Sequence, residues 1–78
     1  MRFEWDPEKA ASNERPHGVT CDEAKELFTA SADVLEIYDV EHSETEDRFE
    51  SIGPIRRGLV LVVWTERADD LIRIVSAR

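Results

Sequence analysis

Polar and apolar side chains alternate over residues 2–5, which is the pattern of a short half-buried strand. Asp6 and Pro7 follow directly. Because Asp is a favoured N-cap and Pro a favoured first helical residue, they predict a helix that begins at Pro7 and runs to about Glu14.

The next segment carries two residues that interrupt regular structure. Pro16 lacks the N–H that a helix interior needs, and Gly18 suits a left-handed backbone conformation. The sequence therefore predicts a tight loop over residues 15–18 that presents His17.

A second helix is predicted from the spacing of Thr20 and Glu23, a hydroxyl followed three residues later by a carboxylate, as in a capping box. The helix should run to about Thr29. Its apolar residues Ala24 and Leu27 lie on one side by the three-and-four rule, so this side is predicted to pack on a flat surface.

From residue 34 onward, β-branched and aromatic residues dominate four short segments separated by polar or glycine-containing turns. Short connections favour an antiparallel meander, because parallel strands need long crossovers. The run 59–64 has no polar face and is predicted to be a central strand, covered on both sides or partly buried in an assembly. The predicted strands are 34–38, 48–52, 59–65 and 71–76, with turns at 41–46, at Gly53-Pro54 with Gly58, and at 68–70.

Together these elements predict one α+β domain, residues 1–78, with a short N-terminal strand and two helices packed on an antiparallel meander. The single cysteine, Cys21, allows no intramolecular disulfide, which favours a reducing, cytoplasmic location. The first residues are charged and carry no signal-like apolar stretch. No segment approaches the roughly 20 apolar residues that span a bilayer, so no membrane association is expected.

Charge is distributed unevenly along the chain, whose formal net charge is −8. Residues 1–50 contain five basic and fifteen acidic side chains, whereas residues 51–78 contain five Arg against three acids. Arg grips phosphate through a planar, two-pronged group, so the C-terminal third is the candidate region for binding nucleic acid. The acidic remainder suits solvation, a salt-rich cytoplasm or a basic partner protein.

His17 is a candidate general acid or base, because imidazole exchanges a proton near pH 7 without a shifted pKa. A single histidine in a turn is more often an ordinary surface residue, and that alternative stays open.

Arg73 interrupts the otherwise apolar segment 71–75, where a charge is costly unless it is paired or placed at a site. It is a candidate for contacting phosphate, and the alternative is a salt bridge to an acid on a neighbouring strand, such as Glu50 or Glu66. Arg48 is a weaker candidate of the same kind, since it stands among acids.

Other kinds of site find little support. One Cys and two His, at positions 21, 17 and 42, do not have the spacing of a closed metal site, so no metal or other cofactor is expected. No Gly-rich phosphate loop and no Ser-His-Asp arrangement is present. Trp5 and Trp64 are expected to pack between helices and sheet and not to stack on bases.

Several motifs in a fixed order resemble one family over nearly the whole chain. The N-terminal half contributes residues 3–7, Lys9-Ala10, Asn13 and His17-Gly18-Val19 leading into Glu23-Ala24 and Phe28. The C-terminal half contributes His42-Ser43, residues 46–49, Ile52-Gly53, residues 59–67 and residues 72–78. This ordered set resembles the BrnT family of ribonuclease toxins from toxin-antitoxin pairs.

The resemblance implies a RelE-like fold and a metal-independent endoribonuclease that cleaves RNA and thereby inhibits translation. It also implies a BrnA-type antitoxin as partner, and it leaves open a homodimer or a hetero-oligomer with that antitoxin. On this basis His17, Arg48 and Arg73 are the predicted catalytic residues. The predicted contacts to RNA phosphates are Arg57, Arg67 and Arg78.

Two positions depart from the family pattern, and both remove positive charge. Pro16 stands where the family usually has Lys, and the chain ends at Arg78 where the family usually continues into a basic helical tail. The alternative hypothesis is therefore a catalytically weakened member that acts only as an antitoxin-binding, autoregulatory partner.

Overall fold

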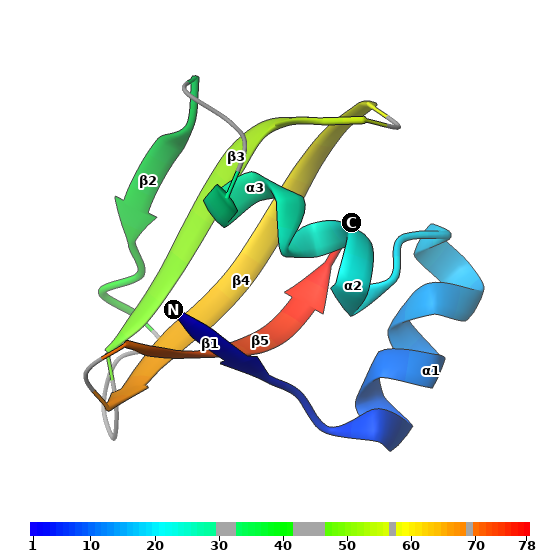
Figure 1. Cartoon of the computed structure of the whole chain (residues 1–78), viewed down its shortest axis with the longest axis horizontal. Helices are drawn as coiled ribbons and strands as arrows, with labels where there is room; N and C mark the ends of the chain where they lie inside the picture. Colours follow the sequence, from blue (N-terminus) through cyan, green and yellow to red (C-terminus); the bar gives the residue numbers. More distant parts are fainter. Residues whose placement is uncertain (30–32, 42–46, 57, 69) are drawn as a thin grey trace.

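The protein is described from a computed structural model, which covers residues 1–29, 33–41, 47–56, 58–68 and 70–78, without the side chains of residues 13–17. A twisted five-stranded sheet lies behind helices that cross one of its faces (Figure 1). The predicted α+β class is confirmed. The elements are β1 (Arg2–Glu4), α1 (Pro7–His17), α2 (Cys21–Ala24), α3 (Glu26–Thr29), β2 (Leu35–Tyr38), β3 (Arg48–Ile55), β4 (Gly58–Ala68) and β5 (Leu71–Ala77).

The sheet has the strand order β1-β5-β4-β3-β2, so β4 is the middle strand, as its apolar sequence predicts. Strands β2 to β5 form the expected antiparallel meander. The short N-terminal strand β1 adds to β5 in parallel, which makes the sheet mixed. The long connection between β1 and the rest of the sheet, which holds all three helices, provides the crossover that a parallel neighbour requires.

The first helix is longer than predicted. It runs from Pro7 to His17 and includes Pro16, so the predicted loop over residues 15–18 is wrong except at its last residue. A proline within the last turn removes one helical hydrogen bond, and its fixed φ is itself helical, so the helix continues past it. The helix ends before Gly18, whose φ of 72° is the left-handed conformation expected there.

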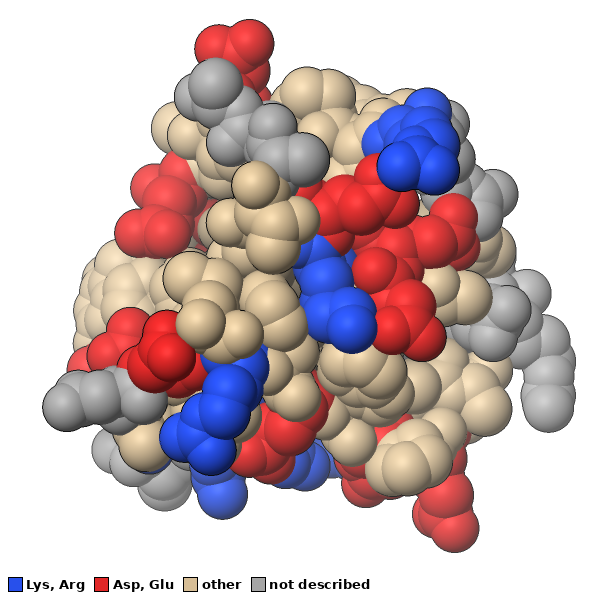
Figure 2. All heavy atoms as spheres, viewed as in Figure 1, with Lys and Arg blue, Asp and Glu red and all other residues tan. Residues whose placement is uncertain are grey.

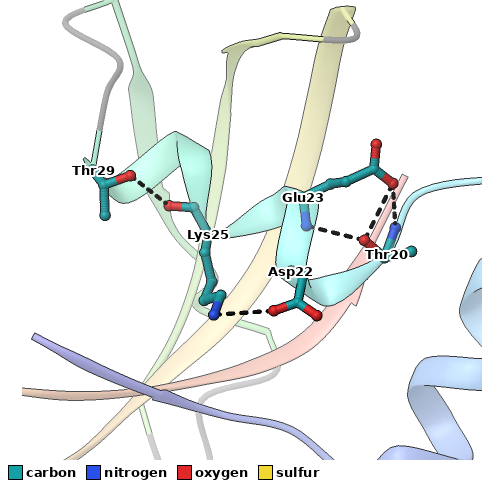
Figure 3. Close-up of polar contacts among 5 residues, drawn as sticks. All are labelled: Thr20, Asp22, Glu23, Lys25 and Thr29. Atoms are coloured by element: carbon teal, nitrogen blue, oxygen red, sulfur yellow. Dashed lines mark hydrogen bonds and ion pairs between the residues drawn. The ribbon is translucent and has the colours of Figure 1, made fainter.

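The predicted second helix is divided into α2 and α3 at Lys25. Its start is the predicted capping box: the Thr20 hydroxyl accepts from Glu23 N at 3.0 Å, and the Glu23 carboxylate accepts from Thr20 N at 3.1 Å (Figure 3). Lys25 pairs with Asp22 at 3.0 Å across the same turn. The two short helices thus hold a fixed direction across the sheet, although neither is long enough to be stable alone.

One predicted turn is wrong. Gly53 and Pro54 lie inside β3, and the chain turns after Ile55 instead. A Cβ at Gly53 would come within 2.8 Å of Leu27 Cδ1, so glycine permits α3 to approach the strand closely. Pro54 lies beyond the last residue of β3 that pairs with β2, where a missing N–H breaks no ladder bond.

Of the predicted turn at 68–70, Asp70 lies in a turn at a φ of 70°, Ala68 is the last residue of β4, and residue 69 lies outside the described residues. The predicted turn at 41–46 lies mostly outside them as well.

The hydrophobic core lies between the sheet and α2–α3, on the side that we call the core face. Trp64 is buried there and donates from Nε1 to Ser51 Oγ at 2.8 Å, while Phe49 stacks on its ring at a centroid distance of 4.6 Å. Trp5 packs against this core, so the predicted packing role of both tryptophans is confirmed. The core residues are Val19, Cys21, Ala24, Leu27, Val60, Val62, Trp64, Ile72, Ile74 and Ala77.

Within the described part of the chain, no helix is long and apolar enough to cross a membrane.

Candidate functional site

The register of the sheet aligns four side chains in one row across neighbouring strands. Arg48 of β3 lies opposite Thr65 of β4, and Thr65 lies opposite Arg73 of β5. Arg73 in turn lies opposite Glu4 of β1. Because side chains alternate along a strand and Trp64 faces the core, the row lies on the opposite side of the sheet, which we call the outer face.

Two irregularities in the β4–β5 ladder flank this row. The register shifts between Val63 and Trp64, and again between Glu66 and Ala68. Bulges increase local twist, re-aim side chains and occur often beside active sites. The Thr65–Arg73 pair is thus held on a short regular stretch between two places where the ladder bends.

Arg73 is half-buried, and its Nη1 donates to Glu4 Oε2 in an ion pair that is itself largely shielded from solvent. Arg73 therefore does form a salt bridge to an acid on a neighbouring strand, which was the alternative to phosphate binding. The partner is Glu4 of β1, and neither of the two examples named from the sequence, Glu50 and Glu66. A carboxylate beside a guanidinium balances its charge and fixes its orientation. The pair also places a proton acceptor next to a group that binds anions.

Thr65 is fully buried between the two arginines, and its Oγ1 has no hydrogen-bond partner among the described residues. A buried hydroxyl without a partner costs about 1–3 kcal/mol. Such groups are rare in folded proteins and call for a physical explanation, of which a functional role is one.

A small cavity of about 90 Å³ opens beside the row, at the edge of β5 beyond the end of β1. Three of its side chains are cationic, whereas Asp6, its acidic side chain, already accepts from Glu8 N at 2.9 Å as the cap of α1. Cations around a concave, partly enclosed space favour an anionic ligand. The lining residues are Trp5, Asp6, Lys9, Ala10, Cys21, Arg48, Arg73, Ile74 and Val75.

The structure brings two of the three predicted catalytic residues, Arg48 and Arg73, to one cavity. His17 is the last residue of α1, so its backbone lies roughly 12 Å further along that helix than Lys9, which lines the cavity. The side chain of His17 is outside the described part of the structure. The histidine is therefore on the helix that borders the cavity, at its far end.

The predicted phosphate contacts are scattered. Arg67 is exposed at the second register shift, two residues from Thr65. Arg78 pairs through its backbone with Leu61, which places it roughly 13 Å along β4 from the row. Arg57 lies outside the described residues.

Cys21 contributes to the cavity from the core side. Burial, and next to it the charge of Asp22, raise the pKa of its thiol, so the group stays neutral and is a poor nucleophile or metal ligand. Among the described residues, no cluster of three His, Cys, Asp or Glu side chains is arranged to hold a metal ion.

Three contributors to the site were not predicted as such. Thr65 directly follows the apolar run 59–64, so its sequence context marks it only as a strand residue. Glu4 was predicted to lie in a strand and Lys9 at the start of a helix, without a role in the site. The register between β1 and β5 joins residues almost seventy positions apart, and local patterns in a sequence carry no information on such a pairing.

Fold and site together define a class: a small α+β protein with two arginines aligned on one face of its sheet, beside a cavity that three cationic side chains line. The family model of the ribonuclease toxin BrnT, of type II toxin-antitoxin systems, matches residues 5–78, and the chain belongs to this family. The resemblance noted in the sequence is thereby confirmed. Family membership implies RNA as substrate and an antitoxin protein as partner. No individual curated protein matches the chain.

Proposed function

We propose that this protein is an endoribonuclease toxin that cleaves RNA without a metal ion, inhibits translation in the cytoplasm and is neutralised by a BrnA-type antitoxin. The observation that supports this most is the alignment of Arg48, Thr65 and Arg73 beside a cation-lined cavity. We further propose that the fold is a RelE-like variant, in which the active site lies on the sheet and the helices provide the core.

Metal-independent cleavage uses the ribose 2′-hydroxyl as the nucleophile on the adjacent phosphate. Its proton passes to a base, the phosphorane gathers negative charge, and the departing 5′-oxygen takes a proton from an acid. In this scheme Arg48 and Arg73 bind the phosphate and stabilise that charge, which is the task for which a rigid pair of guanidinium groups is suited.

Two residues are candidates for moving the protons. His17 is the one proposed from the sequence, and it requires the end of α1 to approach the bound RNA. Glu4 is the second, because its carboxylate already contacts Arg73 in the row. Along the rest of the strand of RNA, Arg67, Arg78 and Arg57 are proposed to contact further phosphates.

The decisive experiment is cleavage of a fluorescent RNA oligonucleotide by the purified chain in EDTA. Arg73→Ala should reduce kcat/KM by about 100- to 1,000-fold, as is typical for the loss of one group that stabilises transition-state charge. Arg56→Ala removes an equally charged but exposed side chain at the β3–β4 turn and serves as the matched control. It should cleave like the wild type.

Equal cleavage by wild type and Arg73→Ala would contradict the proposed site. Activity that appears only when a divalent cation is added would contradict metal independence. A folded wild-type chain without any cleavage would favour the alternative in which the protein only binds its antitoxin.

A further inference from the structure

Exposed apolar side chains gather in one short segment. Of the six large hydrophobic residues that are exposed in the described part of the chain, four lie between residues 35 and 40. Their exposed fractions are high: Leu35 59%, Ile37 41%, Tyr38 46% and Val40 76%. Single exposed apolar residues need no explanation, but two neighbours on one face of a strand, as Leu35 and Ile37 are on the outer face, form a candidate contact surface.

This segment is also an edge of the sheet. Strand β2 pairs with β3 on one side, every residue of β2 is exposed, and in Figure 1 no other strand or helix lies along its outer side. The N–H and C=O groups on that side can template a further strand, a hazard that proteins usually limit with prolines, bulges or lysines. Between Leu35 and Tyr38 there is no proline, bulge or lysine, and the strand is limited only by its length of four residues and by the charge of Glu36.

The charge around β2 decides what kind of strand can be added. From Glu26 to Asp47 the sequence has eight acidic residues and no Lys or Arg. Accordingly, the described residues at the upper left of Figure 2, over β2, are drawn as acidic or uncharged, and no basic group is drawn among them. Pairing two copies of β2 would place Glu36, Asp39 and Glu41 of one copy beside those of the other, and like charges that close repel. A basic segment would instead be attracted.

We propose that β2 is the docking strand for a basic, partly apolar segment of a partner protein, which extends the sheet beyond β2. Backbone hydrogen bonds supply affinity in this mode, and alternate side chains supply specificity. Leu35 and Ile37 share the outer face and are covered by the partner's apolar side chains, while Glu36 faces its Lys or Arg on the other side.

The proposed function names the partner on which this inference rests: the antitoxin. Docking at β2 differs in place from binding at the row: Glu36 and Ile37 lie opposite Ser51 and Glu50 of β3. Arg48, the residue of the row nearest to β2, lies beyond these pairs and contacts Asp39 through its backbone. Arg73 is two strands further away. The antitoxin segment at β2 would therefore anchor the complex, and its loss should leave RNA cleavage by the isolated toxin unchanged.

The test measures binding of the purified cognate antitoxin to the full chain by calorimetry. Glu36→Lys and Ile37→Lys should each weaken Kd by at least about tenfold, since each places an unpaired cation against a basic strand. Glu8→Lys is the matched control for Glu36→Lys, with the same charge change on an exposed residue of α1, and it should bind like the wild type. RNA cleavage by all three variants, together with their urea denaturation midpoints, shows that they are folded.

Unchanged antitoxin binding by both β2 variants would overturn the proposal. So would a wild-type homodimer, seen by sedimentation, that Ile37→Lys dissociates, because the occupant would then be a second copy. A wild-type chain that cleaves RNA but does not bind the antitoxin overturns the docking inference and leaves the catalytic proposal standing. A chain that binds the antitoxin through β2 without cleaving RNA supports the docking inference and overturns the catalytic proposal.

Discussion

The core face and the outer face of the sheet are formed by the same strands but differ in how their side chains are buried and hydrogen-bonded. On the core face, Val62, Trp64 and Ile74 are buried against α2 and α3, and the polar Ser51 has its partner in Trp64. On the outer face, Thr65 has no partner among the described residues, and Leu59 is 74% exposed. The buried hydroxyl of Ser51 on the core face is thus paired, whereas the buried hydroxyl of Thr65 on the outer face has no partner among the described residues.

This difference indicates which face carries stability and which carries function. Selection for folding alone would pair or remove a buried hydroxyl and shield an apolar edge, because each costs free energy. Features that persist against that cost gather where a ligand or a partner completes them. The outer face has two such features: the row at Thr65, and the strand β2.

The largest expected effect is on stability at the core face. Leu27 is 2% exposed, so Leu27→Ala should lower the free energy of unfolding by about 2–5 kcal/mol through lost burial and a cavity beside Gly53. Leu59→Ala makes the same chemical change at an exposed site and should cost less than about 0.5 kcal/mol. Urea denaturation of both variants measures the difference. Similar losses would mean that the outer face is also covered, for example by self-association.

A smaller effect of opposite sign is expected at Thr65. Replacing its unpaired, buried hydroxyl with a methyl group in Thr65→Val should raise the free energy of unfolding by about 1 kcal/mol, because a desolvation cost disappears. RNA cleavage should fall, if the hydroxyl serves the phosphate held between Arg48 and Arg73. Thermal denaturation and cleavage assays on one preparation test both. A less stable variant would show that the hydroxyl has a partner in solution, such as a bound water.

Local chemistry made much of this fold predictable. The capping box at Thr20, the left-handed Gly18 and the alternation within each strand are decided by residues a few positions apart, and all of them appear in the structure. The error at Gly53 comes from tertiary packing. Gly53 resembles a turn residue, yet it is a strand residue at which α3 comes close, and no pattern within five residues of it contains Leu27.

The candidate site was predictable in part for the same reason. Arg73 attracts attention because it is a charge in an apolar strand, and Arg48 because of the family motif. Their neighbours in the row, Thr65 and Glu4, are ordinary strand residues until the register is known. Sequence patterns predict which residues each strand contains. The site depends in addition on which strands pair and in what register, and these patterns do not predict that.

The smallest effect concerns Cys21, which lies where the core meets the cavity. Burial and Asp22 raise the pKa of its thiol in the folded state, so the folded protein holds this proton more tightly than the unfolded chain does. The stability that the thiol contributes is therefore complete below the unfolded pKa of about 8.5 and is lost as pH rises through the folded value. Urea midpoints between pH 7 and 10 should fall less steeply for Cys21→Ala than for the wild type. Labelling by iodoacetamide should likewise be slow below pH 9 in the folded protein and fast in urea. Equal labelling rates in both states would mean that the cavity admits solvent through to the core face, and that the two faces are less separate at this point than the structure indicates.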